Sequence, residues 1–204
     1  MILSAFNAHA LKERLIKLES KGPLAFGAVC CERLLPNYLA FQKDTGWGDI
    51  NLVRKALDCV WASISGNLQS PQEIGNISAS CEAAAPSSDD FQSLYVTSAQ
   101  DVCFAVCGLL DYLLENDVDK IVQAATYAID SVDLYVQEIE NMAPNDPKLE
   151  QKILSHSLMQ RELMQQEENL KVIEQARPLS QEFLDQLKQS WDNNGKSNLD
   201  IPLD

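Results

Sequence analysis

The sequence predicts an all-α protein, folded as a single compact bundle of about seven or eight helices with one long helix in its C-terminal half. Apolar residues recur at spacings of three and four over most of the chain, and no useful length of it alternates as a strand does. The 204 residues, 46 % of them hydrophobic, suffice for one domain without disulfides or a metal. Residues 1–195 are expected to form that domain, and residues 196–204 a C-terminal tail.

The first two helices are expected to meet at a glycine–proline pair. Residues 7–20 carry leucines at helical spacing, and Gly22 and Pro23 end that helix and begin the next. The second helix contains residues 24–35. Pro36 is expected to kink or end it, because proline lacks an amide hydrogen and disfavours the helical conformation of the residue before it.

Capping residues predict where the next helices begin. Asp49 is a suitable N-cap for a helix over residues 50–65. Ser70 and Glu73 have the spacing of a capping box, although Gly75 weakens the helix that follows.

The most apolar segment, residues 99–116, is expected to be the central helix. It follows a break at Pro86 and is opened by Thr97 or Ser98. Asn116 and Asp117 then turn the chain into another helix, over residues 118–141.

A long helix is expected from about residue 147 to residue 176, with an apolar seam close to a heptad pattern. Pro178 ends it, Ser180 caps a final helix, and Gly195 is expected at the C-terminal end of that helix. The residues of the seam are Leu149, Ile153, His156, Met159, Leu163, Leu170 and Ile173.

The segment CERLLPNYLAFQKDTGWGD, residues 31–49, has two interpretations. As a hinge between helices, its two glycines around Trp47 permit a tight reversal, the indole ring enters the bundle, and Asp49 caps the next helix. As a site, its polar residues line a pocket beside Pro36. The hinge is favoured because it gives every unusual residue a structural use. The polar residues of the pocket interpretation are Glu32, Arg33, Asn37, Tyr38 and Asp49.

The same segment resembles the signature of the YjaG-like family, bacterial proteins of unknown function. Two further pieces are similar: residues 86–91, PSSDDF, and residues 197–201, SNLDI, where Leu199 and Asp200 depart from the usual Ser-Asn-Ile-Gly. The resemblance implies a compact all-α bacterial cytoplasmic domain and no particular activity. The signature is matched by Cys31, Glu32, Arg33, Pro36, Asn37, Tyr38, Phe41, Thr45, Gly46, Trp47, Gly48 and Asp49.

The sequence lacks the residue sets of common enzymes and metal sites. It has no P-loop, GxSxG, GxGxxG or HExxH, so no catalytic residue, cofactor or metal is expected. Its histidines, His9 and His156, are expected to be an exposed residue and a helix-contact residue. The six cysteines lie among apolar or small neighbours without a CxxC pair, and they are expected to be free core residues in a reducing cytoplasm.

The charge is strongly negative and uneven. The net charge is −14, and residues 61–204 hold eight Lys and Arg against twenty-four Asp and Glu. Such a field repels nucleic-acid phosphates and anionic lipid, so neither partner is expected. No apolar run approaches the roughly 20 residues that a membrane span needs, so no span is expected. An acidic surface is typical of a soluble protein, and the alternative is a basic partner or a cation.

Two functions from different classes remain. The favoured one is a non-enzymatic interaction or structural protein that self-associates as a dimer, supported by the seam of the long helix and the missing catalytic set. The alternative is a small metal-dependent hydrolase or ligand-binding module built on acidic residues near the 31–49 segment; Asp101, if buried, would pair with Arg33 or Arg54. The candidate residues are Glu32, Arg33, Asn37, Tyr38, Trp47, Asp49, Asp89, Asp90 and Asp101.

Overall fold

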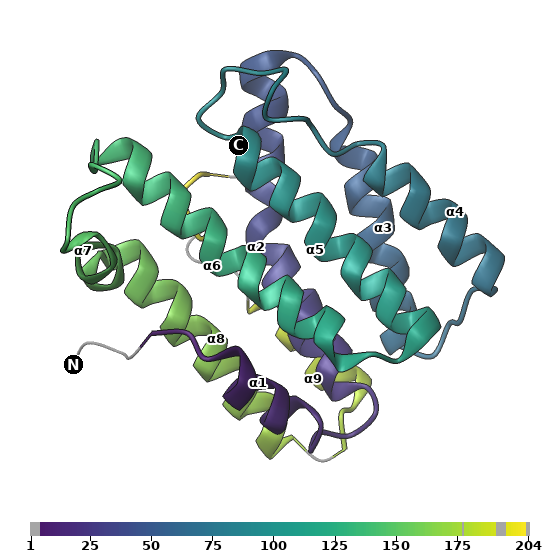
Figure 1. Ribbon diagram of the computed structural model, residues 1–204. Helices are drawn as coiled ribbons and strands as arrows, with labels where there is room; N and C mark the ends of the chain where they lie inside the picture. The colour runs from purple at the N-terminus through teal and green to yellow at the C-terminus, as the bar shows by residue number, and fades with distance from the viewer. Residues whose placement is uncertain (1–4, 177, 191–194, 203–204) are drawn as a thin grey trace.

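The computed structural model describes residues 5–176, 178–190 and 195–202, and this part of the chain contains nine α-helices and no strand (Figure 1). The all-α prediction is confirmed, with a helix count slightly above the expected one. Asp49, Ser70 and Ser180 cap helices as predicted. The helices are α1 (Ala8–Leu15), α2 (Gly22–Thr45), α3 (Ile50–Ile64), α4 (Pro71–Glu82), α5 (Val96–Glu115), α6 (Val118–Ile139), α7 (Leu149–Ser155), α8 (Ser157–Gln175) and α9 (Gln181–Gln189).

Helix α2 is the centre of the bundle. It contacts α3, α5, α6, α8 and α9, and every residue from Gly22 to Tyr38 is buried. Figure 1 shows α5 and α6 side by side in front of α2, with α3 and α4 on one side and α1, α7 and α8 on the other. A helix surrounded in this way is buried on all sides, which is why α2 lacks the single apolar stripe of a surface helix.

Pro36 does not end α2, which excludes one of the two outcomes expected there, a kink or an end of the helix. The helix continues to Thr45 and ends at Gly46, whose φ of 69° is left-handed. The residues before the proline are all buried, and Asn37, Tyr38 and Phe41 are buried after it, so tertiary packing outweighs the missing amide hydrogen.

The long helix expected over residues 147–176 is two helices, α7 and α8. His156 separates them with an extended backbone, and its Nδ1 accepts a hydrogen bond from the Leu158 amide, so the imidazole is the N-cap of α8. The apolar seam predicted for this segment is mostly buried within the chain, where α8 contacts α2 and α6. This seam is therefore not free for a second copy.

The C-terminal segment belongs to the packed structure, although a tail was expected after residue 195. Ser197, Asn198 and Leu199 are buried, and the Asn198 amide donates to the Arg33 carbonyl oxygen at 3.3 Å. Gly195 has a left-handed φ of 76° but does not end α9, whose C-cap is Ser190.

Helix α5 is, among the described residues, the one helix long and apolar enough to cross a membrane by length and composition alone. It contacts α2, α3, α4 and α6 inside the bundle. A buried core helix has the same length and composition, so this property is weak evidence for a membrane.

Candidate functional site

Glu32, the first charged residue of the 31–49 segment, joins α2 to α3. Its carboxylate accepts two hydrogen bonds from the Arg54 guanidinium, at 2.6 and 2.9 Å, and one from the Trp61 indole nitrogen at 2.7 Å. Glu32 is therefore engaged on both oxygens by residues of the next helix. Glu32 and Arg33 are not paired with each other, because adjacent helical residues point in different directions.

Arg33 joins α2 to α8 through an ion pair in the core. Its guanidinium donates to both carboxylate oxygens of Glu162, at 2.9 and 3.2 Å, and the two side chains are 1 % and 0 % exposed. Burial alone would lower the pKa of Arg33, but the Glu162 carboxylate outweighs that effect and raises it. Gln166 extends the network by donating to Glu162 and to the Ala125 carbonyl of α6.

Asn37 and Tyr38 hold two more distant segments against α2. The Asn37 amide donates to Asn198 at 3.0 Å, which ties the C-terminal segment to the helix. The Tyr38 hydroxyl donates to the Ala84 carbonyl at 2.8 Å and accepts from the Asp49 amide at 3.2 Å. Burial raises the pKa of Tyr38 to about 12, so the hydroxyl keeps its proton.

Trp47 lies at the surface rather than inside the bundle. Its side chain is 39 % exposed, and its ring meets Phe41 and Phe91 at centroid distances of 6.0 and 5.2 Å. Asp49 caps α3 as predicted. The segment is thus a junction whose side chains contact α3, α8, the residue 84–91 region and the C-terminal segment.

The predicted acidic residues do not meet. Asp89 and Asp90 are exposed in a turn, and Asp101 is buried, where it accepts a hydrogen bond from Ser131 at 2.8 Å. The expected partners of Asp101 are engaged elsewhere, Arg33 by Glu162 and Arg54 by Glu32. In the described ranges no group of three or more His, Cys, Asp or Glu side chains is placed to hold a metal ion. The metal-dependent alternative is therefore not supported.

Asp101 is expected to make the stability depend on pH. Burial raises its pKa from an ordinary 3.8 to about 7, and the Ser131 hydrogen bond only partly opposes this rise. Between these two values the folded protein holds a proton that the unfolded chain has lost, so the free energy of unfolding falls as pH rises and levels off above about 7.

In the variant Asp101→Asn the free energy of unfolding should not show this decrease with rising pH. The difference in free energy of unfolding between the variant and the parent protein should therefore grow in favour of the variant, by a few kcal/mol between pH 4 and pH 8. Urea denaturation of both proteins between pH 4 and pH 8 measures the difference. Parallel curves would show that Asp101 does not titrate in this range.

A groove of about 570 Å³ opens beside Asp101, where the start of α5 faces the C-terminal half of α6; we call it the α5–α6 groove. Leu94 and Leu134 stand 40 % and 46 % exposed on it. No sequence motif predicted this groove, although Leu134 lies off the buried stripe of α6, a position typical of an exposed residue. Its lining residues are Phe91, Gln92, Ser93, Leu94, Thr97, Ser98, Ser131, Leu134, Tyr135, Gln137, Glu138, Met142 and Pro144.

Acidic residues adjoin the lining of the α5–α6 groove. Three polar side chains of the lining donate hydrogen bonds to aspartates outside it: Ser93 to the exposed Asp44, Ser131 to the buried Asp101, and Gln137 to Asp133. A fourth carboxylate, that of Glu138, lines the groove itself, and no Lys or Arg is among the lining residues. The lining is therefore mixed, with large apolar side chains among neutral polar ones, and Glu138 adds a negative charge to it.

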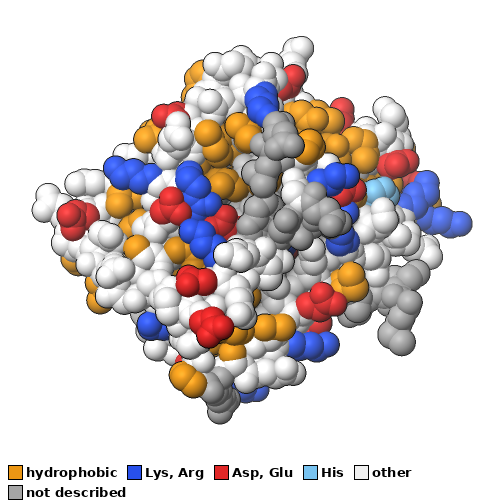
Figure 2. Space-filling model, turned by 180° about the vertical axis from the view of Figure 1, so that it is seen from behind, with side chains coloured by type: hydrophobic (Ala, Val, Ile, Leu, Met, Phe, Trp, Pro, Cys, Tyr) orange, Lys and Arg blue, Asp and Glu red, His pale blue; other side chains and the backbone are white. Residues whose placement is uncertain are grey.

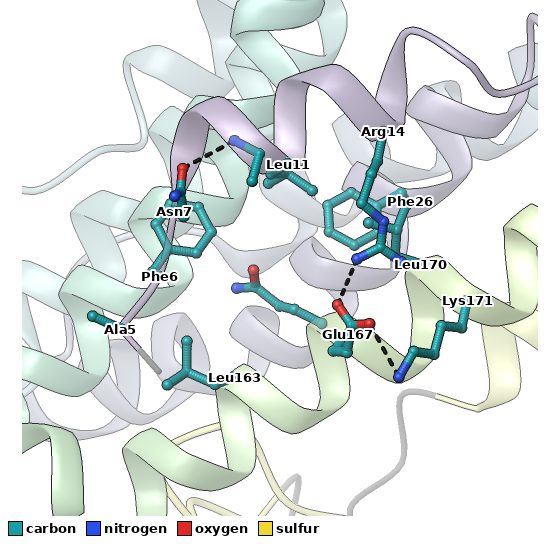
Figure 3. A pocket seen from close by; sticks show the side chains of 12 residues that line it. Ala5, Phe6, Asn7, Leu11, Arg14, Phe26, Leu163, Glu167, Leu170 and Lys171 are labelled. Carbon is teal, nitrogen blue, oxygen red and sulfur yellow. Dashed lines mark hydrogen bonds and ion pairs between the residues drawn. The ribbon is translucent and has the colours of Figure 1, made fainter. Parts of the chain in front are cut away.

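A second hollow, of about 350 Å³, lies between α1, α2 and α8 (Figure 3). Figure 3 shows Arg14 and Lys171 both directed at Glu167 across its mouth. Arg14 also pairs with Glu174. These charged side chains pair with one another and attach α1 to α8. Their presence at this hollow is therefore explained by the packing of the two helices, and no ligand is needed to explain it.

Comparison with known proteins places this fold among bacterial proteins of unknown function. The family model described as "Protein of unknown function (DUF416)" matches residues 10–202. The "Uncharacterized protein YjaG" of Escherichia coli K12 is 34 % identical over 125 residues, 58 % of this chain and 61 % of that protein. Its counterpart in Salmonella typhimurium LT2 is 34 % identical over 109 residues, 51 % of this chain and 53 % of that protein. The matched part thus spans only about half to three fifths of these relatives.

A solved structure shares the whole architecture. The crystal structure of a DUF416 family protein from Shewanella baltica OS155 is similar with a TM-score of 0.85 and 25 % sequence identity. The match covers 98 % of this chain and 100 % of that one. The resemblance first noted in the 31–49 segment therefore extends through the fold.

Proposed function

The chain belongs to the DUF416 family of bacterial proteins of unknown function, and from that premise we propose that it is a non-enzymatic interaction protein of the cytoplasm whose α5–α6 groove binds a segment of a partner protein. The observation that carries the proposal is the groove itself. Large apolar side chains rim a hollow on one face, and exposed apolar patches of this kind characterise docking sites.

The use of the polar residues supports an interaction role over catalysis. Glu32, Arg33 and Tyr38 contact other helices or the backbone and hold the fold together. The groove, by contrast, is lined by neutral side chains apart from Glu138, and these include Phe91, Tyr135 and Met142, whose residue types are enriched at protein interfaces. Figure 2 shows the molecule from behind, where hydrophobic side chains are spread among Lys, Arg, Asp and Glu side chains.

Site-specific photo-crosslinking in cells tests the docking role. A photoreactive amino acid at Leu94 or Leu134 is expected to give one adduct with the same partner, identified by mass spectrometry of the linked peptides. The control position is Leu68, in the loop between α3 and α4, which is 78 % exposed and remote from the groove. Adducts formed equally at Leu68, or none at either groove position, would contradict the proposal.

Self-association is a separate part of the proposal, and we assign it to the outer face of α8. Met164 and Val172 are each 47 % exposed and lie two turns apart on one broad face of this helix. In an antiparallel contact between two copies, Met164 of one lies opposite Val172 of the other, so the surface is complementary to itself.

The double variant Met164→Glu/Val172→Glu is expected to be a monomer at concentrations where the parent protein is a dimer, because four carboxylates would meet in the contact. Native mass spectrometry over a concentration series measures this, with Leu68→Glu as the control for an exposed leucine. A parent protein that stays monomeric throughout would refute self-association.

A further inference from the structure

The carboxylates around the α5–α6 groove identify the chemistry of its occupant. We infer that the groove binds a basic amphipathic helical segment, with apolar residues on one face and Lys or Arg on both flanks. This inference rests on the proposed docking function and adds the class of partner.

The walls of the groove fit the apolar face of a helix. Leu94, from the segment before α5, and Leu134, from α6, both line the groove and are exposed. Met142 and Phe91 add two further large apolar side chains to the lining, and Tyr135 stacks on Tyr95 at 6.4 Å between ring centroids. Leucine and methionine side chains adapt to varied apolar surfaces, and such grooves bind helices through residues spaced three and four apart.

The surrounding charge selects the flanks of that helix. Glu138 lines the groove, and Asp44 accepts a hydrogen bond from the lining residue Ser93. Asp89 and Asp90 immediately precede Phe91, another lining residue. Within the described residues, none of these carboxylates forms an ion pair with a basic side chain.

The basic residues near the groove do not cancel this field. Arg161 is bound to Asp200 at 2.7 Å and Lys152 to Asp146 at 2.6 Å, so both are already neutralised. Lys43 is exposed and precedes Asp44 in the sequence, so it offsets at most the charge of that residue. The charges of Asp89, Asp90 and Glu138 remain. An acidic segment would meet like charges, whereas a basic one would gain charge pairs at the rim and a faster association.

A second copy of this chain is a poor occupant of the groove for the same reason. Each copy carries a net charge of −14, and residues 56–119 contain no Lys or Arg at all. Pairing two grooves would set acidic rims against each other, which costs affinity. A partner with the opposite charge avoids that repulsion.

Fluorescence anisotropy with labelled model peptides tests the inference on the full chain. The probe is a Leu/Lys amphipathic peptide of about 18 residues, roughly 27 Å long as a helix. Its matched controls are the Leu/Glu analogue and a Leu/Lys peptide scrambled to destroy the apolar face. We expect the amphipathic Leu/Lys peptide to bind at least about tenfold more tightly than either control, and to weaken with added salt.

Charge-neutral variants locate the binding site. Asp89→Asn/Asp90→Asn/Glu138→Gln should weaken binding about tenfold and reduce its salt dependence. The matched control, Glu19→Gln/Glu182→Gln/Asp185→Asn, removes the same charge from exposed positions elsewhere and should leave binding within about twofold. Equal weakening by both triple variants would reveal only general attraction to an acidic protein and would overturn the inference.

The variant Leu134→Ser separates failure of the inference from failure of the docking function. If it abolishes binding of the Leu/Lys peptide, both stand. If the Leu/Glu analogue binds as tightly as the Leu/Lys peptide and Leu134→Ser abolishes both, the groove docks helices but charge does not select them. If no peptide binds, or binding ignores Leu134→Ser, and crosslinking at Leu94 also yields nothing, the docking function fails as well.

Discussion

Replacement of Arg33 by methionine is expected to destabilise the protein by about 3–5 kcal/mol, because it leaves the Glu162 carboxylate charged and unpaired in the core. The pair is fully buried, and the Glu162 oxygens lie 2.9 and 3.2 Å from the guanidinium. Gln166 would still donate to Glu162, but one neutral hydrogen bond does not offset the loss of a buried counter-charge. Urea denaturation at pH 7, monitored by circular dichroism, measures the effect.

Two further variants test the cause of that loss. In Arg33→Met/Glu162→Leu both charges are absent, and most of the lost stability should return because an apolar pair of similar size carries no desolvation cost. Arg14→Met removes a partly exposed pair with Glu167 and Glu174, and should cost only about 1 kcal/mol. If Arg33→Met costs no more than Arg14→Met, the buried pair is not what holds α2 to α8.

Gly48→Ala is expected to cost about 2–4 kcal/mol, since it combines backbone strain with a steric clash. Gly48 has a left-handed φ of 93°, and a Cβ atom there would lie 2.5 Å from the Tyr38 hydroxyl oxygen. That hydroxyl is held on two sides, by the Ala84 carbonyl and the Asp49 amide, and moving it would break both hydrogen bonds. Thermal and urea unfolding of the variant measure the loss.

Gly66→Ala is the matched control for Gly48→Ala. Gly66 has nearly the same φ, 95°, but nothing lies within 4 Å of the added Cβ. It should therefore lose only the strain of the left-handed conformation, about 1 kcal/mol. Equal losses at the two positions would show that the Tyr38 contact contributes nothing.

The 31–49 segment holds several parts of the fold together. Its signature residues serve several junctions at once: Glu32 to α3, Arg33 to α8, Asn37 to the C-terminal segment, and Tyr38 to the Ala84 carbonyl. A sequence signature of this kind reports a shared fold, whereas the surface proposed for binding lies at its edge, where Trp47 meets Phe91.

The local features of this protein were readable in the sequence. The caps at Asp49, Ser70 and Ser180 form as predicted because each depends on hydrogen bonds to residues two or three positions away. The all-α class followed in the same way from periodicity along each segment. Local rules did not decide whether α2 ends at Pro36, and they missed the break at His156, whose imidazole caps α8.

Only the tertiary structure decided which polar groups meet. Arg33 and Glu162 are 129 positions apart, and Asn37 and Asn198 are 161 apart, so no spacing rule connects them. The same holds for Asp101, whose partner proved to be Ser131 of the neighbouring helix rather than an arginine. The α5–α6 groove likewise exists only because α6 and the segment before α5 are brought together by helix packing, and the acidic residues at it come from separate elements, Asp44 from α2 and Glu138 from α6.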